Sequence, residues 1–300
     1  MAARARLLIS YAHPDDESFG LGGLIAKYVA EGVEVYLICA TNGDVGTVKP
    51  EFMKGYDSVA ALRLAELDKA SKILGFKEVF KFGYKDSGMM SSETAKDPDC
   101  LWQQPVEAVT RRVVEVIREI QPQVVITFNK YGGYGHPDHI AIQRATVEAF
   151  FKASEPGYET GQAPYQPQKL YYSAIAKRQI QMGIMIMRIR GQDPRHVGRN
   201  KDIDIQAIVN NAEPVHTTIN IGAYSAQWEM ASACHASQLG GRTTPRLPQA
   251  IRQRVFSKQG FTRIHPKPAH DRVDEHDLFA GVKLDERAIP APTAQQLEPA

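Results

Sequence analysis

Residues 7–23 read LLISYAHPDDESFGLGG, an apolar run that leads directly into a charged turn. Leu7 to Tyr11 predicts a buried β-strand, and Phe19 to Glu31 predicts a helix that ends at Gly32. Between these patterns, positions 13–17 hold one histidine and three carboxylates. Such a density of charge at the end of a buried strand is unfavourable unless something compensates it. A divalent metal ion would do so, because carboxylate oxygens and imidazole nitrogens are metal ligands.

Strand and helix patterns alternate through the first half of the chain. Further strands are predicted at 33–40, 79–82 and 124–128, and further helices at 58–74, 106–120 and 138–151. Short strands that alternate with helices of this length indicate βαβ units. The sequence therefore predicts an α/β protein with a parallel sheet.

The second half of the chain carries weaker signals. Short strands are predicted at 170–174, 217–221 and 261–264, and a helix at 224–237. We interpret 179–211 as an insertion that covers the substrate. We expect a single domain over 1–275 and a loose C-terminal tail over 276–300, in a stretch rich in proline, alanine and charge.

A second histidine cluster, which reads GHPDH over 135–139, follows the predicted strand at 124–128. Ligand sites of parallel sheets lie beyond the carboxyl ends of the strands. Because both charged clusters directly follow strands, we expect 135–139 to share one site with His13, Asp15 and Asp16.

Two imidazoles and one carboxylate form a typical zinc site with one open coordination position. His13 and Asp16 are the candidate ligands from the first cluster, and either His136 or His139 is the candidate from the second. Fe²⁺ accepts the same types of ligand, so the residue types leave the metal open.

The remaining polar residues of the two clusters suit the chemistry of hydrolysis. Asp15 stands next to a candidate ligand and is therefore the candidate general base. The downstream histidine that does not bind the metal could stabilise an oxyanion or protonate the leaving group. Asp138 could orient that histidine through a ring nitrogen.

The composition disfavours several other classes of function. A net charge of +2 with interspersed acids and bases argues against a nucleic-acid partner. Three widely spaced cysteines form neither a disulfide framework nor a CxxC motif, which favours a reducing cytoplasm. Apolar runs fall far short of the ~20 residues of a membrane span, so we expect no stable membrane insertion.

The glycines at 20, 22 and 23 do not form a dinucleotide-binding fingerprint. Ile25 occupies the position that the third glycine of that motif would need. We interpret Gly22 and Gly23 as sites where the helix packs closely against a neighbour.

These motifs resemble the LmbE/PIG-L family of zinc-dependent N-deacetylases, which remove acetyl groups from N-acetylglucosamine units. The two histidine clusters carry the resemblance, which is dense over 7–150 and thin afterwards. Weaker matches between them are Thr41, Gly43 and Gly46 of a T-x-G-x-x-G loop, Arg63 and Glu66 of an R-x-x-E helix, and the segment 84–89. That last segment is similar to the branch of the family that acts in mycothiol chemistry.

The resemblance implies a three-layer, Rossmann-like α/β fold, with a mostly parallel sheet flanked by helices. It implies that His13, Asp16 and His139 bind Zn²⁺ and that Asp15 is the general base. By the same resemblance, His136 assists the tetrahedral intermediate and the leaving amine.

The resemblance also implies that His136 acts as an imidazolium that Asp138 orients. Substrate contacts are implied for Arg63, Asp86 and His235.

Two positions depart from the family pattern. Trp228 stands where a lysine is usual, seven residues before His235, and Asn129 stands where many members carry aspartate. Neither departure touches the implied metal ligands.

The sequence therefore predicts a cytoplasmic, metal-dependent hydrolase that removes the N-acetyl group from an N-acetylglucosaminyl small molecule or glycoconjugate. The expected partner is a small-molecule glycoside or amide. One alternative is an amidase for a larger linear amide, such as a mycothiol S-conjugate. Another is a non-catalytic metal-containing binding protein. A metal phosphoesterase is disfavoured because it usually needs a second metal about 3.5–4 Å from the first.

Overall fold

The computed structural model describes residues 4–198, 201–239 and 257–284. Within them the chain forms a seven-stranded sheet in the order β3-β2-β1-β4-β5-β7-β6. The strands are β1 Arg6–Tyr11, β2 Glu34–Thr41, β3 Glu78–Tyr84, β4 Val124–Thr127, β5 Lys169–Ala174, β6 Thr217–Asn220 and β7 Lys258–His265. Strands β1 to β5 pair in parallel, whereas β7 is antiparallel to both β5 and β6. The predicted parallel α/β sheet is thus confirmed, with a mixed edge.

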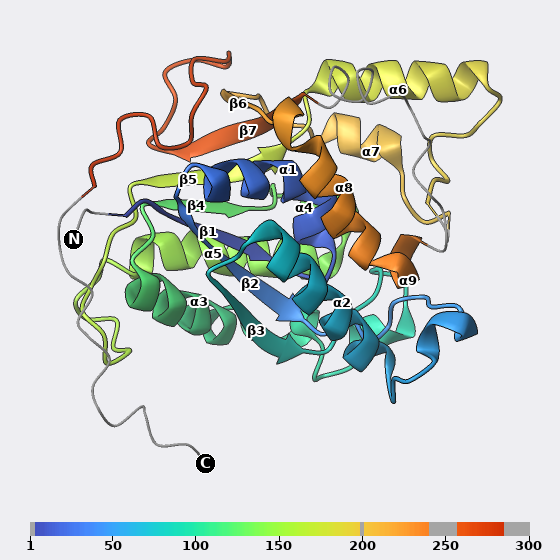
Figure 1. Ribbon diagram of the computed structural model, residues 1–300, viewed down its shortest axis with the longest axis horizontal. Coiled ribbons are helices and arrows are strands. Elements are labelled where there is room, and N and C mark those ends of the chain that lie inside the picture. Colours follow the sequence, from blue (N-terminus) through green and yellow to red (C-terminus); the bar gives the residue numbers. More distant parts are fainter. Residues whose placement is uncertain (1–3, 199–200, 240–256, 285–300) are drawn as a thin grey trace.

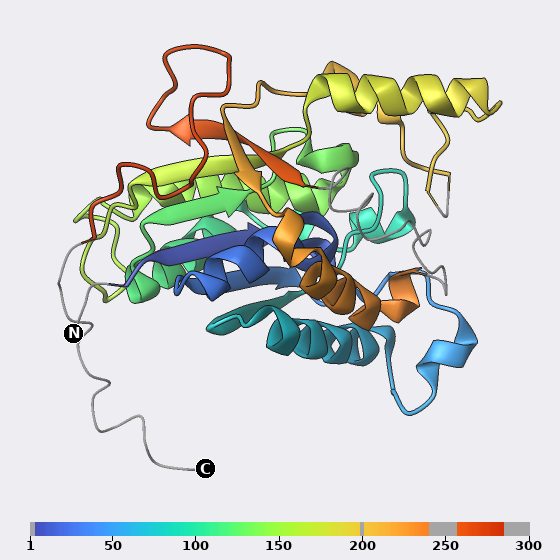
Figure 2. The ribbon, with the colours of Figure 1, turned by 45° about the horizontal axis from the view of Figure 1, so that its top comes forward.

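Helices cover both faces of this sheet, as Figures 1 and 2 show. The connections from β1 to β2 and from β4 to β5 run in opposite directions across the sheet. Since such crossovers are right-handed, they place their helices on opposite faces. One layer holds α1 Asp16–Ala30, α2 Val59–Leu74 and α8 Ser225–Cys234, and the other holds α3 Val106–Ile120 and α5 Pro137–Lys152.

The strand order reverses between β1 and β4, which are neighbours in the sheet although far apart in sequence. At such a switch point the loops after the two strands diverge and leave a crevice beyond their carboxyl ends. The residues after β1 and those after β4 include both histidine clusters. The topology therefore brings the two clusters together.

Local sequence signals set both ends of α2. Ser58 caps α2 by accepting a hydrogen bond from the Ala61 amide at 3.1 Å, and Gly75 ends it in the left-handed region at φ 80°. Helix α1 begins at Asp16, earlier than predicted. The first turn of a helix favours acidic residues, so Asp16 and Glu17 belong to the helix, whereas Asp15 precedes it.

Gly22 and Gly23 lie where α1 packs against α8 and against the residues just before that helix. A Cβ atom on Gly22 would lie 2.6 Å from Cδ1 of Trp228, and one on Gly23 would lie 2.9 Å from Cδ1 of Ile221. No side chain fits at such distances, so the interpretation of both glycines as close packing sites is confirmed. The same contact explains how a tryptophan is accommodated at 228.

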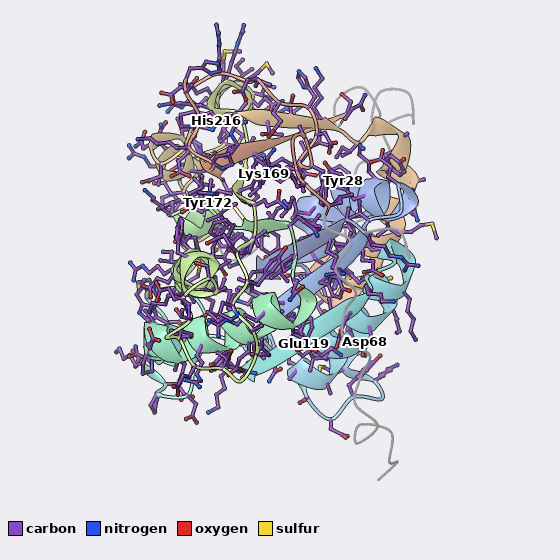
Figure 3. The ribbon with its side chains drawn as sticks, turned by 90° about the vertical axis from the view of Figure 1, so that its left-hand side faces the viewer. Tyr28, Asp68, Glu119, Lys169, Tyr172 and His216 are labelled. Atoms are coloured by element: carbon purple, nitrogen blue, oxygen red, sulfur yellow. The ribbon has the colours of Figure 1, made fainter. Side chains whose placement is uncertain are left out.

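The C-terminal strands carry a buried ionic network. Glu275 accepts hydrogen bonds from Lys169 of β5, from Tyr171 at 2.5 Å and from Thr217 of β6 at 2.7 Å. Figure 3 shows Lys169 and His216 in this part of the molecule, and Glu119 of α3 near the opposite end. The network ties the mixed edge to the parallel sheet.

The predicted loose tail differs from the structure at its start. Leu278 is fully buried, and its amide donates to the Tyr28 hydroxyl at 2.8 Å. That hydroxyl donates in turn to Asp277 at 2.9 Å, so this segment packs on α1. Residues 285–300 lie outside the described residues.

The region 179–211 contains two helices that the sequence did not predict, α6 Lys177–Ile189 and α7 Ile205–Asn210. The helix predicted at 224–237 is divided at His235 into α8 and the short α9 Ala236–Leu239. Within the described residues, no helix is both long and apolar enough to cross a membrane.

Candidate metal centre and active site

Three side-chain atoms from the two clusters form a compact triangle. Nδ1 of His13 lies 3.0 Å from Nε2 of His139, and each nitrogen lies 3.3 Å from Oδ2 of Asp16. Ligand atoms bound to one tetrahedral zinc at about 2.0–2.1 Å are themselves roughly 3.3 Å apart. The triangle therefore has the size of one face of such a site.

The outer ring nitrogens determine what the triangle offers. Nε2 of His13 lies 3.1 Å from Oδ2 of Asp138, and Nδ1 of His139 lies 3.1 Å from the carbonyl oxygen of Gly132. Both partners are acceptors, so we assign a ring proton to each outer nitrogen. Two imidazole lone pairs and a carboxylate oxygen then converge, which requires a cation between them.

The electrostatic surroundings also favour a positive charge at this point. Burial lowers the pKa of His13, but Asp86, Asp138 and Asp16 together raise that pKa well above its usual range. In the metal-free protein a proton on His13 satisfies the triangle. A divalent metal ion fits the same place by size and by donor set.

His136 lies close to this triangle but is held differently. Its ring nitrogens come within 4.8 Å of ligand atoms of His13 and His139. Its Nδ1 accepts a hydrogen bond from the Asp138 amide at 3.2 Å, so the ring caps α5. This contact leaves the ring proton on Nε2.

The surroundings of His136 affect its protonation state. Burial, followed by the nearby His13 and His139, lowers the pKa of His136 well below its usual range. The lowered pKa favours a neutral imidazole with a donor at Nε2 over the imidazolium that the resemblance implies. A neutral ring remains able to donate a hydrogen bond to an oxyanion.

The carboxylate of Asp138 serves a different histidine from the one predicted. It is fully buried, accepts from the amide of Ser87 at 2.8 Å and from its hydroxyl, and faces His13. Its nearest approach to Nδ1 of His136 is 3.9 Å. Asp138 therefore orients His136 through its backbone amide, whereas its carboxylate orients His13. Ser87 was not singled out as a site residue, although it directly follows Asp86 in the sequence.

Asp15 occupies a strained turn beside Arg63. Its φ of 142° lies in a region that residues other than glycine rarely adopt. Arg63 donates to the Pro14 carbonyl at 2.9 Å and approaches Oδ2 of Asp15 at 3.1 Å. Burial raises the pKa of Asp15 to about 6 against the opposing charge of Arg63. A carboxyl with that pKa can take up a proton near neutral pH.

A cavity of about 540 Å³ opens on this side of the triangle. Arg63 and Asp86 line it, with Nη1 of Arg63 and Oδ2 of Asp86 3.7 Å apart. Other polar residues of its wall include Ser91, Ser92, Thr94 and Gln238. Gly43 passes so close to Arg63 that a Cβ atom there would lie 2.3 Å from Nη1. The predicted T-x-G-x-x-G loop therefore supports the arginine.

His235 does not line this cavity. It is fully buried, and its Nε2 is 2.9 Å from Oε1 of Glu17. The other carboxylate oxygen of Glu17 accepts from the Asp15 amide at 3.0 Å. In this structure His235 holds the carboxylate that positions Asp15, and a substrate contact of His235 stays a prediction. Glu17 is a positioning residue that the sequence did not single out, although it belongs to the charged turn.

A second cavity of about 220 Å³ lies on the opposite side of the triangle, next to Asp16 and His139. Its wall is mostly apolar and includes Phe19, Phe128, Ile175, Ile180 and Ile208. Phe128 stacks on the ring of His139 at a centroid distance of 3.9 Å. Tyr134 lines both cavities. The two cavities thus present different chemistry to one metal position.

Comparison with known proteins points to the same family as the two histidine clusters. Residues 8–150 match the family model PIG-L, described as GlcNAc-PI de-N-acetylase. The chain is 33% identical over 287 residues to 1D-myo-inositol 2-acetamido-2-deoxy-alpha-D-glucopyranoside deacetylase of Thermobifida fusca, covering 92% of this chain and 99% of that protein. A protein of the same name from Nocardiopsis dassonvillei is 34% identical over 293 residues, covering 92% and 100%.

Solved structures share the fold at lower identity. N,N'-diacetylchitobiose deacetylase from Pyrococcus horikoshii superimposes with a TM-score of 0.60 at 19% identity, covering 89% of this chain and 88% of that chain. The 4-carboxy-2-hydroxymuconate hydratase GalB from Pseudomonas putida KT2440 gives 0.58 at 18% identity, covering 89% and 98%. Since these two proteins have different activities, this likeness concerns the fold alone. Sequence identity to the full-length relatives shows that the chain belongs to the PIG-L family of de-N-acetylases, as its two histidine clusters predicted.

Proposed function

We propose that this protein is a zinc-dependent hydrolase that removes the N-acetyl group from an N-acetylglucosaminyl inositol or a similar small glycoside. The observation that carries the proposal is the triangle of His13, Asp16 and His139 beside a carboxyl of raised pKa and a polar cavity. The names of the relatives at 33–34% identity support the class of substrate.

His13, Asp16 and His139 would hold the ion through the three atoms of the triangle. A bound Zn²⁺ would polarise the acetyl carbonyl and make a water molecule a better nucleophile. Fe²⁺ suits the same ligand types and is the second candidate metal.

Asp15 would act as the general base. Arg63 engages Oδ2, which leaves the other carboxylate oxygen as the acceptor for a proton of the attacking water. The hydrogen bond from the Asp15 amide to Glu17 fixes the turn that presents this carboxyl to the cavity. The protonated carboxyl can afterwards deliver its proton to the leaving amine.

His136 would stabilise negative charge on the acyl oxygen. Its neutral ring donates from Nε2, and a neutral donor avoids repulsion by a nearby metal ion. The capping hydrogen bond at Nδ1 keeps the ring oriented without a carboxylate partner of its own.

The polar cavity would bind the sugar and its aglycone. Arg63 and Asp86 offer a donor and an acceptor that suit hydroxyl groups, and the serine and threonine hydroxyls of the wall extend the same pattern. The insertion predicted at 179–211 contributes Asp202 and Ile203 to this wall. It is therefore proposed to cover the bound substrate.

The second cavity favours a second candidate function, hydrolysis of a larger amide. If the sugar occupies the polar cavity, an acyl group on the same carbonyl points toward the apolar side of the triangle. The 220 Å³ there exceeds what a methyl group fills. An amidase for a larger conjugate would use this space.

Amine release from N-acetylglucosaminyl inositol tests the main proposal. Protein stripped of metal should be inactive, and Zn²⁺ or Fe²⁺ should restore release of amine. Asp68→Asn serves as a matched control, because it removes an exposed carboxylate that pairs with Lys81 far from the site. One bound metal per chain without amine release from any amide would contradict the proposal and favour a binding protein.

The two amide substrates can be separated on the same protein. Ile208→Trp narrows the apolar cavity. It should slow hydrolysis of a cysteinyl-amide conjugate while sparing the N-acetyl substrate. If the variant changed the hydrolysis rates of both substrates by the same factor relative to the wild type, this result would contradict use of the apolar cavity by the acyl group.

A further inference from the structure

Helix α6 carries two apolar stripes on opposite sides. Ile180 and Ile184 face inward, where Ile180 lines the apolar cavity and Ile184 is buried. The outward stripe consists of Met182, Met185, Ile186 and Ile189, with exposed fractions of 55%, 57%, 42% and 77%. The spacing i, i+3, i+4, i+7 places these four side chains on one face.

The charged residues of the same helix are all basic. Lys177, Arg178, Arg188 and Arg190 lie at its ends, and no acidic residue occurs from 177 to 192. Figures 1 and 2 show α6 at the outer edge of the molecule, beyond α7 and away from the sheet. An exposed apolar stripe bordered by cations is typical of helices that lie in a lipid interface.

We propose that α6 binds the surface of an anionic membrane, with its outward stripe among the acyl chains and with Arg178 and Arg190 at the lipid phosphates. This is peripheral binding, since 13 residues fall short of the ~20 that a spanning helix needs. It is therefore compatible with the expected absence of stable membrane insertion.

Charge argues against two other occupants of the stripe. A second copy of α6 packed on this face would bring the cations of both helices together. The segment 240–256, which lies outside the described residues, has four arginines and no acidic residue in its sequence. Both would add like charge, whereas an anionic lipid surface supplies the opposite charge.

Co-sedimentation of the full-length protein with vesicles tests this proposal. The protein should pellet with vesicles of phosphatidylglycerol and phosphatidylcholine, and remain in solution with phosphatidylcholine alone. Each cation near an anionic surface contributes about fivefold to the partition coefficient. Arg178→Gln with Arg190→Gln should therefore lower it about 25-fold, and added salt should weaken binding of the wild type.

A second variant isolates the apolar stripe. Met185→Gln with Ile189→Gln should abolish pelleting while amine release from a soluble substrate is retained, because neither residue lines a cavity. Gly183→Ala is the matched control, since a Cβ atom there meets nothing within 4 Å and neither charge nor stripe changes. It should bind as the wild type does.

Three outcomes would overturn the proposal. The first is a wild type that stays in solution with anionic vesicles. The second is a wild-type dimer that the Met185 and Ile189 variant converts to a monomer, which would assign the stripe to a second copy. The third is pelleting that survives loss of the stripe, which would assign binding to charge alone. None of these depends on amine release, so the deacetylase proposal is tested separately.

Discussion

The molecule uses the turn His-Pro-Asp twice, and the two copies do different work. After β1 it reads His13-Pro14-Asp15-Asp16, and after β4 it reads His136-Pro137-Asp138-His139. The fourth residue of each turn, Asp16 or His139, points an atom into the candidate metal triangle. The first and third residues diverge between the two copies. The same three-residue sequence therefore has different chemical roles at two positions of one site, 123 residues apart in the chain.

The neighbours of each turn explain this divergence. The third residue of the first turn, Asp15, faces a cavity beside Arg63, and its pKa is raised to about 6. The third residue of the second turn, Asp138, is fully buried between Ser87 and His13. Partners from the loop after β3, from α2 and from the other turn thus determine the role of each carboxylate.

Removing the fourth residue of either turn should have the largest effect. Asp16→Ala and His139→Ala should each lower bound metal from about one ion per chain to near zero, because two ligands hold zinc poorly. Activity should be lost with the metal. Metal analysis of the purified protein measures this, and His196→Ala, at an exposed histidine, is the control. Retention of metal by either variant would show that the triangle is not the site.

Replacing the third residue of each turn should affect turnover in one case and metal affinity in the other. Asp15→Asn should lower kcat by about 10²–10⁴-fold with metal retained, as expected for loss of a general base. Asp138→Asn should lower metal affinity by about 10–100-fold, because it removes the partner that orients His13. Metal titration and turnover at saturating metal distinguish these results. If both variants lost only metal, Asp15 would not be the base.

Replacing the first residue of each turn gives a further contrast between the two turns. His136→Ala should lower kcat by about 10²–10³-fold with little change in metal content, because one oxyanion donor is lost. His136→Gln retains a side-chain donor and should recover part of the rate. His13→Ala should instead lose the metal. Equal metal loss in the His136 and His13 variants would mean that His136 is itself a ligand.

Local sequence patterns were sufficient to predict the parallel half of the fold. Helix α3 was predicted with both ends correct, and α2 was predicted with its C-terminal end correct and its start one residue early, at Ser58. Both histidine clusters follow strands, and the switch point between β1 and β4 brings them together. The candidate triangle could therefore be proposed before its distances were known.

Roles that depend on distant partners could not be read from local patterns. Glu17 and His235 are 218 residues apart in sequence but 2.9 Å apart in space. The same holds for Ser87 and Asp138, separated by 51 residues. Helix α6 was not predicted, although Met182, Met185, Ile186 and Ile189 recur at helical spacing.

The pair of His235 and Glu17 permits one further contrast, in stability rather than rate, with the smallest expected effect. Burial lowers the pKa of His235, but Glu17 outweighs it and raises that pKa above its usual value. The folded state therefore binds this proton more tightly than the unfolded chain, where the pKa is about 6.5. The resulting stabilisation is complete below that pH and is lost as the pH rises through the folded value.

Urea unfolding at several pH values, with saturating metal, measures this stabilisation. The wild type should exceed His235→Gln in free energy of unfolding by a margin that is largest at acidic pH and shrinks toward alkaline pH. His196→Gln, at an exposed position, controls for loss of a surface histidine. A margin that stays constant with pH would mean that His235 is neutral in the folded protein. Glu17 would then be held by a hydrogen bond from a neutral His235 rather than by an ion pair, while its other oxygen still accepts from the Asp15 amide.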